Sequence, residues 1–405
     1  MATHGTGGLV GFRSEPNCGR GTVGILWSCF STIALSMWAS LHLDLLESGI
    51  EMRIGMFVGC LLIPEAGVAA ATDEYATALY WRDRIRAFPG WESWSLKHSF
   101  LVRMGGVVFA DPAVRGPGSG SRSEHRPGTP DDDDDNEKAK PYYLTLPILL
   151  QLIKEAQPDH TPDHTPAVDK SDGRVSTQPP LQHIRPDMFP STRNINQRAK
   201  TDAMVKVLAL LQALWFAANV IFRLVVGIGL SLLETMTVAY VLCGIFLFIL
   251  WFAKPQGLEE PFDLPISMPA GPKSPASERA DPRSRAQVAR LTTGILLVAL
   301  FSATHLAAWN YPFPSVVETW LWRGSVIASW VLASLPVLNP VLPVSWYSSP
   351  GWYGSFGKRL IPFLATPYLI ARLITFALVF TAFRAVPSSV YEKPSWSSYW
   401  VSLSG

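Results

Sequence analysis

The sequence predicts an all-α protein, a polytopic transmembrane helical bundle of about seven spans with long disordered loops. The strongest observation is an apolar run at residues 23–43, which contains no Asp, Glu, Lys or Arg and is long enough to cross a bilayer as a helix. Charged residues make up only 16% of the chain, and the mean hydropathy is positive, at +0.18. The 15 tryptophans suit aromatic belts at the two membrane interfaces.

Seven segments have the length and composition of membrane-spanning helices. They are residues 23–43, 54–72, 206–222, 231–253, 291–309, 320–338 and 360–383. Glu65 lies in the second segment, Glu234 in the fourth and His305 in the fifth. Arg323 lies in the sixth and Arg372 in the seventh. Because ionisable groups are costly inside a bilayer, each of these side chains is a candidate functional residue.

The spans and the segments between them divide the chain. We expect a cytosolic N-terminal segment at 1–22, the first transmembrane helices and a membrane-proximal segment at 23–110, a low-complexity loop at 111–200, a transmembrane helix pair at 201–255, a Pro-rich linker at 256–290, the C-terminal transmembrane helices at 291–385 and a tail at 386–405. Within the second of these, the apolar run at 99–110 is too short to span and is expected to be interfacial or re-entrant.

The 111–200 loop is rich in Pro, Asp and Ser and contains a run of five aspartates at 131–135. Aspartate-rich motifs bind magnesium when a rigid helix holds the carboxylates. Here the run follows Pro127, Gly128 and Pro130, a composition that favours a solvated acidic tract over a metal site. A short apolar island at 142–153 is expected to lie on the membrane surface.

The sequence predicts no cofactor and no metal. It contains no GxGxxG, P-loop, HExxH or CxxC pattern, and its four cysteines have no metal-ligand spacing. The net charge is only +2 and the basic residues are scattered, which predicts no nucleic-acid partner. The partners that remain are the lipid bilayer and an apolar small molecule.

The distribution of Lys and Arg predicts an orientation for seven spans. The N-terminus and the loops after the second, fourth and sixth spans carry most of the basic residues. By the positive-inside rule these segments are cytosolic and the C-terminus lies across the membrane. We expect a multi-pass protein of the endoplasmic reticulum.

Ordered motifs along the chain resemble a fungal family of multi-pass integral membrane proteins. The motifs are Ser14-Glu15-Pro16, Gly19-Arg20-Gly21-Thr22, Ile25-Leu26-Trp27-Ser28-Cys29, Leu41-His42-Leu43, Pro64-Glu65, Trp94, His98, Met104-Gly105-Gly106, Leu211-Gln212-Ala213-Leu214-Trp215-Phe216, Leu233-Glu234, Lys254-Pro255, His305, Ala308-Trp309-Asn310, Phe313-Pro314, Glu318, Leu321-Trp322-Arg323, Ala371-Arg372-Leu373 and Tyr391-Glu392. The resemblance covers the chain except its two linkers. The family is thought to include membrane-bound terpene cyclases of the ascochlorin and macrophorin type.

The resemblance implies a membrane-bound cyclase of fungal secondary metabolism. Such enzymes cyclise the farnesyl-type chain of a meroterpenoid, a prenylated aromatic compound, by protonating an epoxide or an olefin. That chemistry needs a neutral carboxylic acid, which burial favours, and aromatic faces that stabilise a cation. Glu65 and Glu234 are the candidate acids, and His305 is the candidate base or hydrogen-bonding partner. The candidate substrate-binding residues are Trp27, His42, His98, Trp309, Glu318 and Arg323.

Each of these residues also has a structural interpretation. Glu65 and Glu234 are equally suited to buried ion pairs with Arg323 or Arg372, and the histidines to interhelical hydrogen bonds. Tryptophans near span ends are commonly interface anchors. The alternative functions are a transporter or channel and a non-catalytic membrane scaffold. No inverted repeat is evident between the two halves of the sequence, which disfavours transport.

Overall fold

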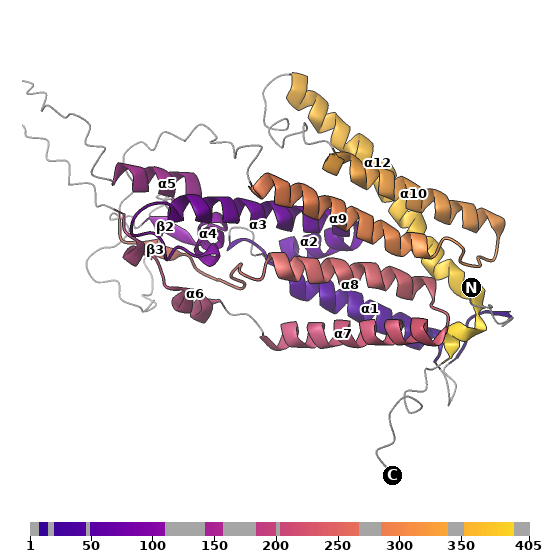
Figure 1. Ribbon diagram of the computed structural model, residues 1–405. Coiled ribbons are helices and arrows are strands. Elements are labelled where there is room, and N and C mark those ends of the chain that lie inside the picture. The colour runs from indigo at the N-terminus through magenta and orange to yellow at the C-terminus, as the bar shows by residue number, and fades with distance from the viewer. Residues whose placement is uncertain are drawn as a thin grey trace, which may run out of the picture.

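The computed structural model is a bundle of long helices with a smaller folded unit at one end (Figure 1). It describes residues 8–14, 20–45, 49–109, 142–156, 184–199, 203–266, 285–338 and 352–392. The helices are α1 (Thr22–Ser40), α2 (Ile50–Leu62), α3 (Pro64–Arg86), α4 (Leu96–Arg103), α5 (Leu146–Glu155), α6 (Thr192–Arg198), α7 (Ala203–Val226), α8 (Leu232–Leu250), α9 (Arg285–Ala307), α10 (Val316–Leu338) and α12 (Trp352–Thr381). Short 3₁₀ helices cover Pro186–Met188, Ala382–Arg384 and Ser388–Tyr391.

The predicted helical class is confirmed: one helix covers most of each of six predicted segments, and two helices, α2 and α3, cover 54–72. Among the described residues, four helices are long and apolar enough to cross a membrane: α1, α8 and most of α7, together with residues 365–384 at the end of α12. A fifth candidate is the bent pair α2–α3. The apolar part of α9, Thr292–Ala307, is shorter. The count of seven spans therefore stays a prediction.

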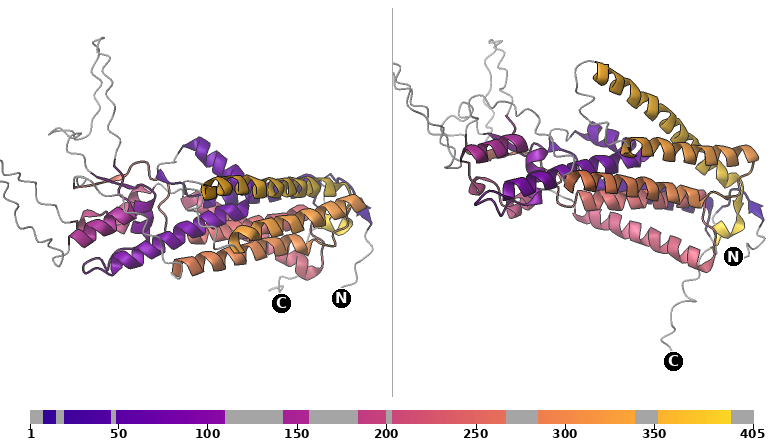
Figure 2. Two further views of the ribbon diagram at one scale, coloured as in Figure 1. Left: turned by 90° about the horizontal axis from the view of Figure 1, so that it is seen from above. Right: turned by 45° about the horizontal axis from the view of Figure 1, so that its top comes forward.

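Helix α8 lies at the centre of the bundle, where it packs against α1, α3 and α9 (Figures 1 and 2). Its central position follows from its sequence, which is apolar on all sides. In contrast, α7 packs mainly against α1 and leaves a row of large apolar side chains exposed, including Leu211, Leu214 and Trp215. An exposed apolar face on a helix of this length is consistent with a membrane-spanning helix.

The second predicted span is a bent pair rather than one straight helix. Helix α2 ends at Leu62, α3 starts at Pro64, and the two axes differ by 116°. Proline has no N–H and its ring clashes with the carbonyl four residues earlier, so it starts a helix readily and interrupts one sharply. Helix α3 then packs along α9 and α8, and its far end lies beside α4 (Figure 1).

A second hydrophobic core lies beside the far end of α3. Helices α4, α5 and α6 surround two parallel strands, β2 (Val107–Phe109) and β3 (Phe262–Leu264), with Val107 paired to Phe262. Residues 99–109 form the end of α4 and strand β2 in that core, and the expectation that this run is interfacial or re-entrant stays a prediction. The two predicted loops also contribute ordered parts to it, namely α5, α6 and β3. The aspartate run lies outside the described residues.

The two ends of the described chain meet at the opposite end of the bundle. Strand β1 (Leu9–Val10) pairs antiparallel with β4 (Val386–Pro387), so Leu9 faces Pro387. Both strands lie near the start of α1 and the end of α12 (Figure 1). An odd number of crossings would put these strands on opposite sides. The pairing favours an even number of crossings, which the bend of 116° at Pro64 would give if α2 and α3 enter and leave on the same side. The expectation that the N- and C-terminal segments lie across the membrane from each other stays a prediction.

Candidate functional site

The break between α2 and α3 leaves backbone carbonyls without helical partners, and two buried side chains bind them. Tyr240 of α8 donates its hydroxyl hydrogen to Leu61 O. Arg372 of α12 donates from Nε to Leu62 O at 3.4 Å and from a terminal nitrogen to Tyr240 Oη at 3.0 Å. The last carbonyls of a helix carry partial negative charge, which a guanidinium complements. This pairing allows a helix to end inside an apolar bundle.

Glu65 lies on the other side of the break, in the first turn of α3. A carboxyl is favoured there because the N-terminus of a helix carries partial positive charge. Tyr368 of α12 donates a hydrogen bond to Glu65 Oε2 at 2.7 Å. Within the part of the chain that is described, no hydrogen bond engages Oε1, the second oxygen of this half-buried side chain. Glu65 therefore has one oxygen held and one available.

His305 joins the same cluster through Arg372. Its Nδ1 lies 2.9 Å from Phe301 O, and its Nε2 lies 3.5 Å from an Arg372 nitrogen. Because the carbonyl and the guanidinium have fixed roles, Nδ1 is the donor and Nε2 the acceptor. Both ring nitrogens are thus engaged, which favours the interhelical hydrogen-bonding role over that of a base.

Aromatic rings surround the cluster. The Arg372 guanidinium lies 4.7 Å from the ring centre of Phe301 and 5.8 Å from that of Phe376. Trp322 lies 6.1 Å from His305 in a stacked arrangement. Arg372 itself is 1% exposed and contacts hydroxyl, imidazole and carbonyl groups rather than a carboxylate of the described residues. The predicted ion pair between Glu65 and an arginine is therefore replaced by hydrogen bonding to Tyr368.

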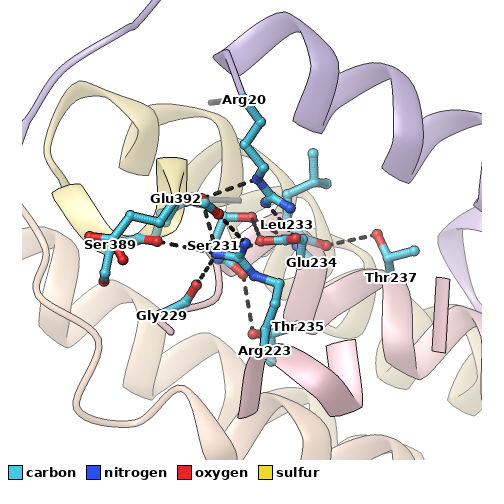
Figure 3. Close-up of polar contacts among 11 residues, drawn as sticks. Arg20, Arg223, Gly229, Ser231, Leu233, Glu234, Thr235, Thr237, Ser389 and Glu392 are labelled. Atoms are coloured by element: carbon cyan, nitrogen blue, oxygen red, sulfur yellow. Dashed lines mark hydrogen bonds and ion pairs between the residues drawn. The ribbon is translucent and has the colours of Figure 1, made fainter. Parts of the chain in front are cut away.

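Glu234 belongs to a different cluster, at the end of the bundle where the chain ends meet (Figure 3). Its Oε1 lies 2.5 Å from an Arg20 nitrogen in an ion pair, and its Oε2 accepts from the backbone and hydroxyl of Ser231 at 2.8 and 2.9 Å. The predicted partners Arg323 and Arg372 are thus wrong for this residue. Ser231 and Glu234 form a capping box at the start of α8. The Ser-x-x-Glu spacing was the available sequence signal for this role.

The same cluster binds the C-terminal segment through its backbone. Arg223 of α7 has 0% exposure and donates to the carbonyls of Gly229, Val390 and Glu392 at 2.5, 3.0 and 2.7 Å (Figure 3). Arg20 donates from Nε to Val390 O at 3.1 Å. We call this cluster, made of Arg20, Arg223, Glu234 and the carbonyls they hold, the terminal clasp.

His42 lies at the opposite end of α1, beside another ionic cluster. Its ring lies 5.7 Å from that of Trp251, and its carbonyl accepts from Lys254 Nζ at 2.8 Å. The same ammonium lies 2.7 Å from Asp44 and 2.8 Å from Glu74. This cluster ties the ends of α1 and α8 to α3.

The other predicted substrate-binding residues are dispersed. His98 belongs to the capping box that Ser95 forms at the start of α4 in the second core, and its Nε2 donates to Pro190 O at 3.0 Å. Arg323 lies over the Trp309 ring at 4.9 Å, and Glu318 pairs with Arg384 near the chain ends. Trp27 is 76% exposed on α1, as an interface anchor would be. Among the described residues of the predicted set, Glu65 and His305 lie in one cluster, and Arg323 and Trp309 contact each other elsewhere.

Sequence reasoning missed the two tyrosines that complete this cluster. Tyr240 and Tyr368 each lie in a predicted span, where a hydroxyl needs a partner, and that requirement was the available signal. Among the described residues, no group of three His, Cys, Asp or Glu side chains is arranged to hold a metal ion.

Comparison with known proteins assigns no activity to these residues. Residues 186–268 match a family of unknown function (DUF8562). No curated protein matches the chain, and no solved structure matches it. The matched range includes α6, α7, α8 and β3, and so contains Arg223, Glu234 and Tyr240.

Proposed function

We propose that the protein is a membrane-bound terpene cyclase that acts on the farnesyl-type chain of a prenylated aromatic compound, with Glu65 as the proton donor. The observation that carries the proposal is the hydrogen bond from Tyr368 to one Glu65 oxygen, beside a buried cluster of tyrosine, arginine, histidine and aromatic rings. The resemblance of the sequence motifs to fungal membrane proteins supports the same activity.

Geometry favours Glu65 over Glu234 as the acid. Both oxygens of Glu234 accept strong hydrogen bonds, one of them in an ion pair with Arg20, so neither oxygen is available to a substrate. Glu65 has only Oε2 engaged, so Oε1 is the atom that would carry the transferred proton. A general acid must reach its substrate with such an atom.

The reaction is a balanced isomerisation. Glu65 protonates the terminal olefin or epoxide, and the resulting cation is attacked by the next double bond of the farnesyl chain. The final cation then loses a proton. This loss balances the proton that Glu65 donated at the start, so no co-reactant is needed. The rings of Phe301 and Phe376 already lie within cation–π distance of the Arg372 guanidinium, so the surroundings of Glu65 are aromatic and suited to a positive charge.

The proposal includes residence in the endoplasmic reticulum membrane and a revised orientation. The end of the bundle that includes the second core carries the basic residues Arg82, Arg84, Arg86, Lys97, Arg103, Lys154, Arg193, Arg198 and Lys254. The other end carries Arg13, Arg20, Arg223 and Arg384. The positive-inside rule then favours a cytosolic second core and lumenal chain ends.

The test compares Glu65→Gln with Glu51→Gln in microsomes from an expressing host. In the first variant the amide oxygen of the introduced glutamine can still accept from Tyr368, so the change removes the acid and keeps the packing. We expect cyclisation of a farnesylated phenol or of its terminal epoxide to decrease on the order of 10²-fold. Glu51 is an exposed carboxylate on α2, and its variant is expected to match the parent.

Two results would contradict the assignment. If the parent cyclises neither substrate, the proposed activity is wrong. If Glu65→Gln cyclises as fast as Glu51→Gln while both are expressed equally, another residue is the acid.

Transport is the second candidate function, and the α2–α3 break is the observation that favours it. Discontinuous helices line the binding sites of many transporters, with side chains satisfying the freed backbone groups. Uptake of a farnesylated phenol into sealed vesicles, without a change in its mass or skeleton, would favour transport over cyclisation.

A further inference from the structure

An open cleft of about 470 Å³ lies on the surface of the second core, away from Glu65 and from the terminal clasp. Its volume is within the range of small-molecule sites. It is lined by Met188, Phe189, Pro190, Asn194, Gln197, Arg198, Phe262 and Asp263. All of these residues fall within 186–268, the range that matches the family of unknown function.

The floor of the cleft is fixed by the core beneath it. The Phe189 ring is 5.8 Å from Trp91 and 5.0 Å from Trp94, both at edge-on angles. The Pro190 carbonyl accepts from His98 Nε2 at 3.0 Å. A cleft with such support is preformed, so little ordering opposes ligand binding.

The polar groups of the cleft have both signs of charge. The Arg198 guanidinium lies over the Phe262 ring, 4.4 Å from its centre. A guanidinium binds phosphoryl oxygens through its N–H groups. Asp263 follows Phe262 in β3 and supplies an acceptor. Asn194 and Gln197 add neutral amides. A ligand that matches this set has an anionic group and a hydrogen-bond donor close together.

The position of the cleft next to a candidate membrane-spanning helix indicates that the ligand is a membrane lipid. Helix α6 ends at Arg198, and the apolar part of α7 that is long enough to span begins at Val207. If α7 crosses the bilayer, the cleft lies at the level of the lipid headgroups. A headgroup also fits the apolar part of the lining, where Met188 and Phe262 can contact the glycerol and upper acyl region.

We propose that this cleft binds the headgroup of a phospholipid of the phosphoethanolamine type. Arg198 binds the phosphoryl oxygens, and Asp263 accepts from the ammonium N–H. Phosphocholine has the same phosphoryl group but no N–H, so the cleft is expected to discriminate between the two. This site is independent of the cyclase proposal, because it involves none of the residues around Glu65.

The test uses the purified full-length protein in mild detergent and native mass spectrometry, with added phosphatidylethanolamine or phosphatidylcholine. The variants are Arg198→Gln and Asp263→Asn. The matched control is Arg193→Gln, an exposed arginine on the same helix that does not line the cleft. Soluble glycerophosphoethanolamine tests whether the acyl chains are needed.

We expect Arg198→Gln to bind phosphatidylethanolamine about tenfold more weakly than the parent, because it loses one charge-assisted hydrogen bond. Arg193→Gln is expected to bind this lipid as tightly as the parent. Asp263→Asn is expected to bind the two lipids equally. Equal binding by Arg198→Gln and Arg193→Gln would overturn the proposal, as would no preference of the parent for ethanolamine. If the parent binds glycerophosphoethanolamine as tightly as phosphatidylethanolamine, the acyl chains do not contribute and the proposal of a membrane lipid as the ligand is wrong.

Discussion

Arg20 and Glu234 form an ion pair at 2.5 Å that joins the segment before α1 to the start of α8. The two residues are separated by 214 positions in the sequence. Arg20 also donates to Val390 O, so the same side chain holds the C-terminal segment. The terminal clasp thus fixes three distant parts of the chain at one end of the bundle.

The first prediction concerns the centre of the clasp. Replacing Arg223 by Met leaves several buried carbonyls without donors, and we expect a loss of about 3 kcal/mol of stability. Arg384→Gln is the control, because its ion pair with Glu318 is largely exposed on the arginine side and is worth less than about 1 kcal/mol. Thermal unfolding in detergent measures both variants, and equal melting temperatures would contradict the assigned role.

The second prediction concerns topology. An epitope inserted near Asp135 is expected to be digested when protease is added to sealed microsomes, because that loop connects elements at the basic end of the bundle. Epitopes at the N- and C-termini are both expected to be protected. If one terminus is digested and the other protected, the number of crossings is odd and the β1–β4 pairing does not form in the membrane.

The third prediction concerns His98 and pH. Burial of the imidazole lowers the pKa of His98 below its ordinary value of 6.5, and Nδ1 accepts from the Ser95 backbone, which favours the neutral ring. The unfolded chain therefore takes up a proton at a higher pH than the folded chain does. The stability contributed by this group is complete above about pH 6.5 and decreases as the pH falls below that value.

Replacing His98 by Gln should remove this pH dependence. Gln has no titrating group and can still donate to Pro190 O. Limited proteolysis of the second core between pH 7.5 and 5 checks the expectation. An equally steep loss of protection in His98→Gln would assign the effect to another group.

The fourth prediction concerns the acidic tract. Deletion of residues 116–135 is expected to leave expression and activity unchanged, because their composition is hydrophilic and interrupted by Pro and Gly. Product formation in microsomes measures the outcome. Loss of all product from a well-expressed deletion would mean that the aspartates bind an essential partner.

Much of the fold could be predicted from local sequence, and so could part of the candidate cluster. Apolar runs located the long helices, because length and hydropathy are properties of a contiguous segment. Glu65, His305 and Arg372 were identified because ionisable groups in apolar spans are rare. Two further features are visible in the local sequence. Pro64 indicates the break between α2 and α3, and the Ser-x-x-Glu spacing at Ser231 indicates that Glu234 caps α8.

The sequence by itself determined that this is a helical chain with apolar segments of membrane-spanning length, because each segment's burial preference depends on its own composition. Only the tertiary structure decided which carboxyl has an oxygen available. Tyr368 binds Glu65 from 303 positions away, and Arg20 binds Glu234 from 214 positions away. Such pairings depend on how helices pack, and a Glu in an apolar run has the same local sequence whichever partner the fold brings to it.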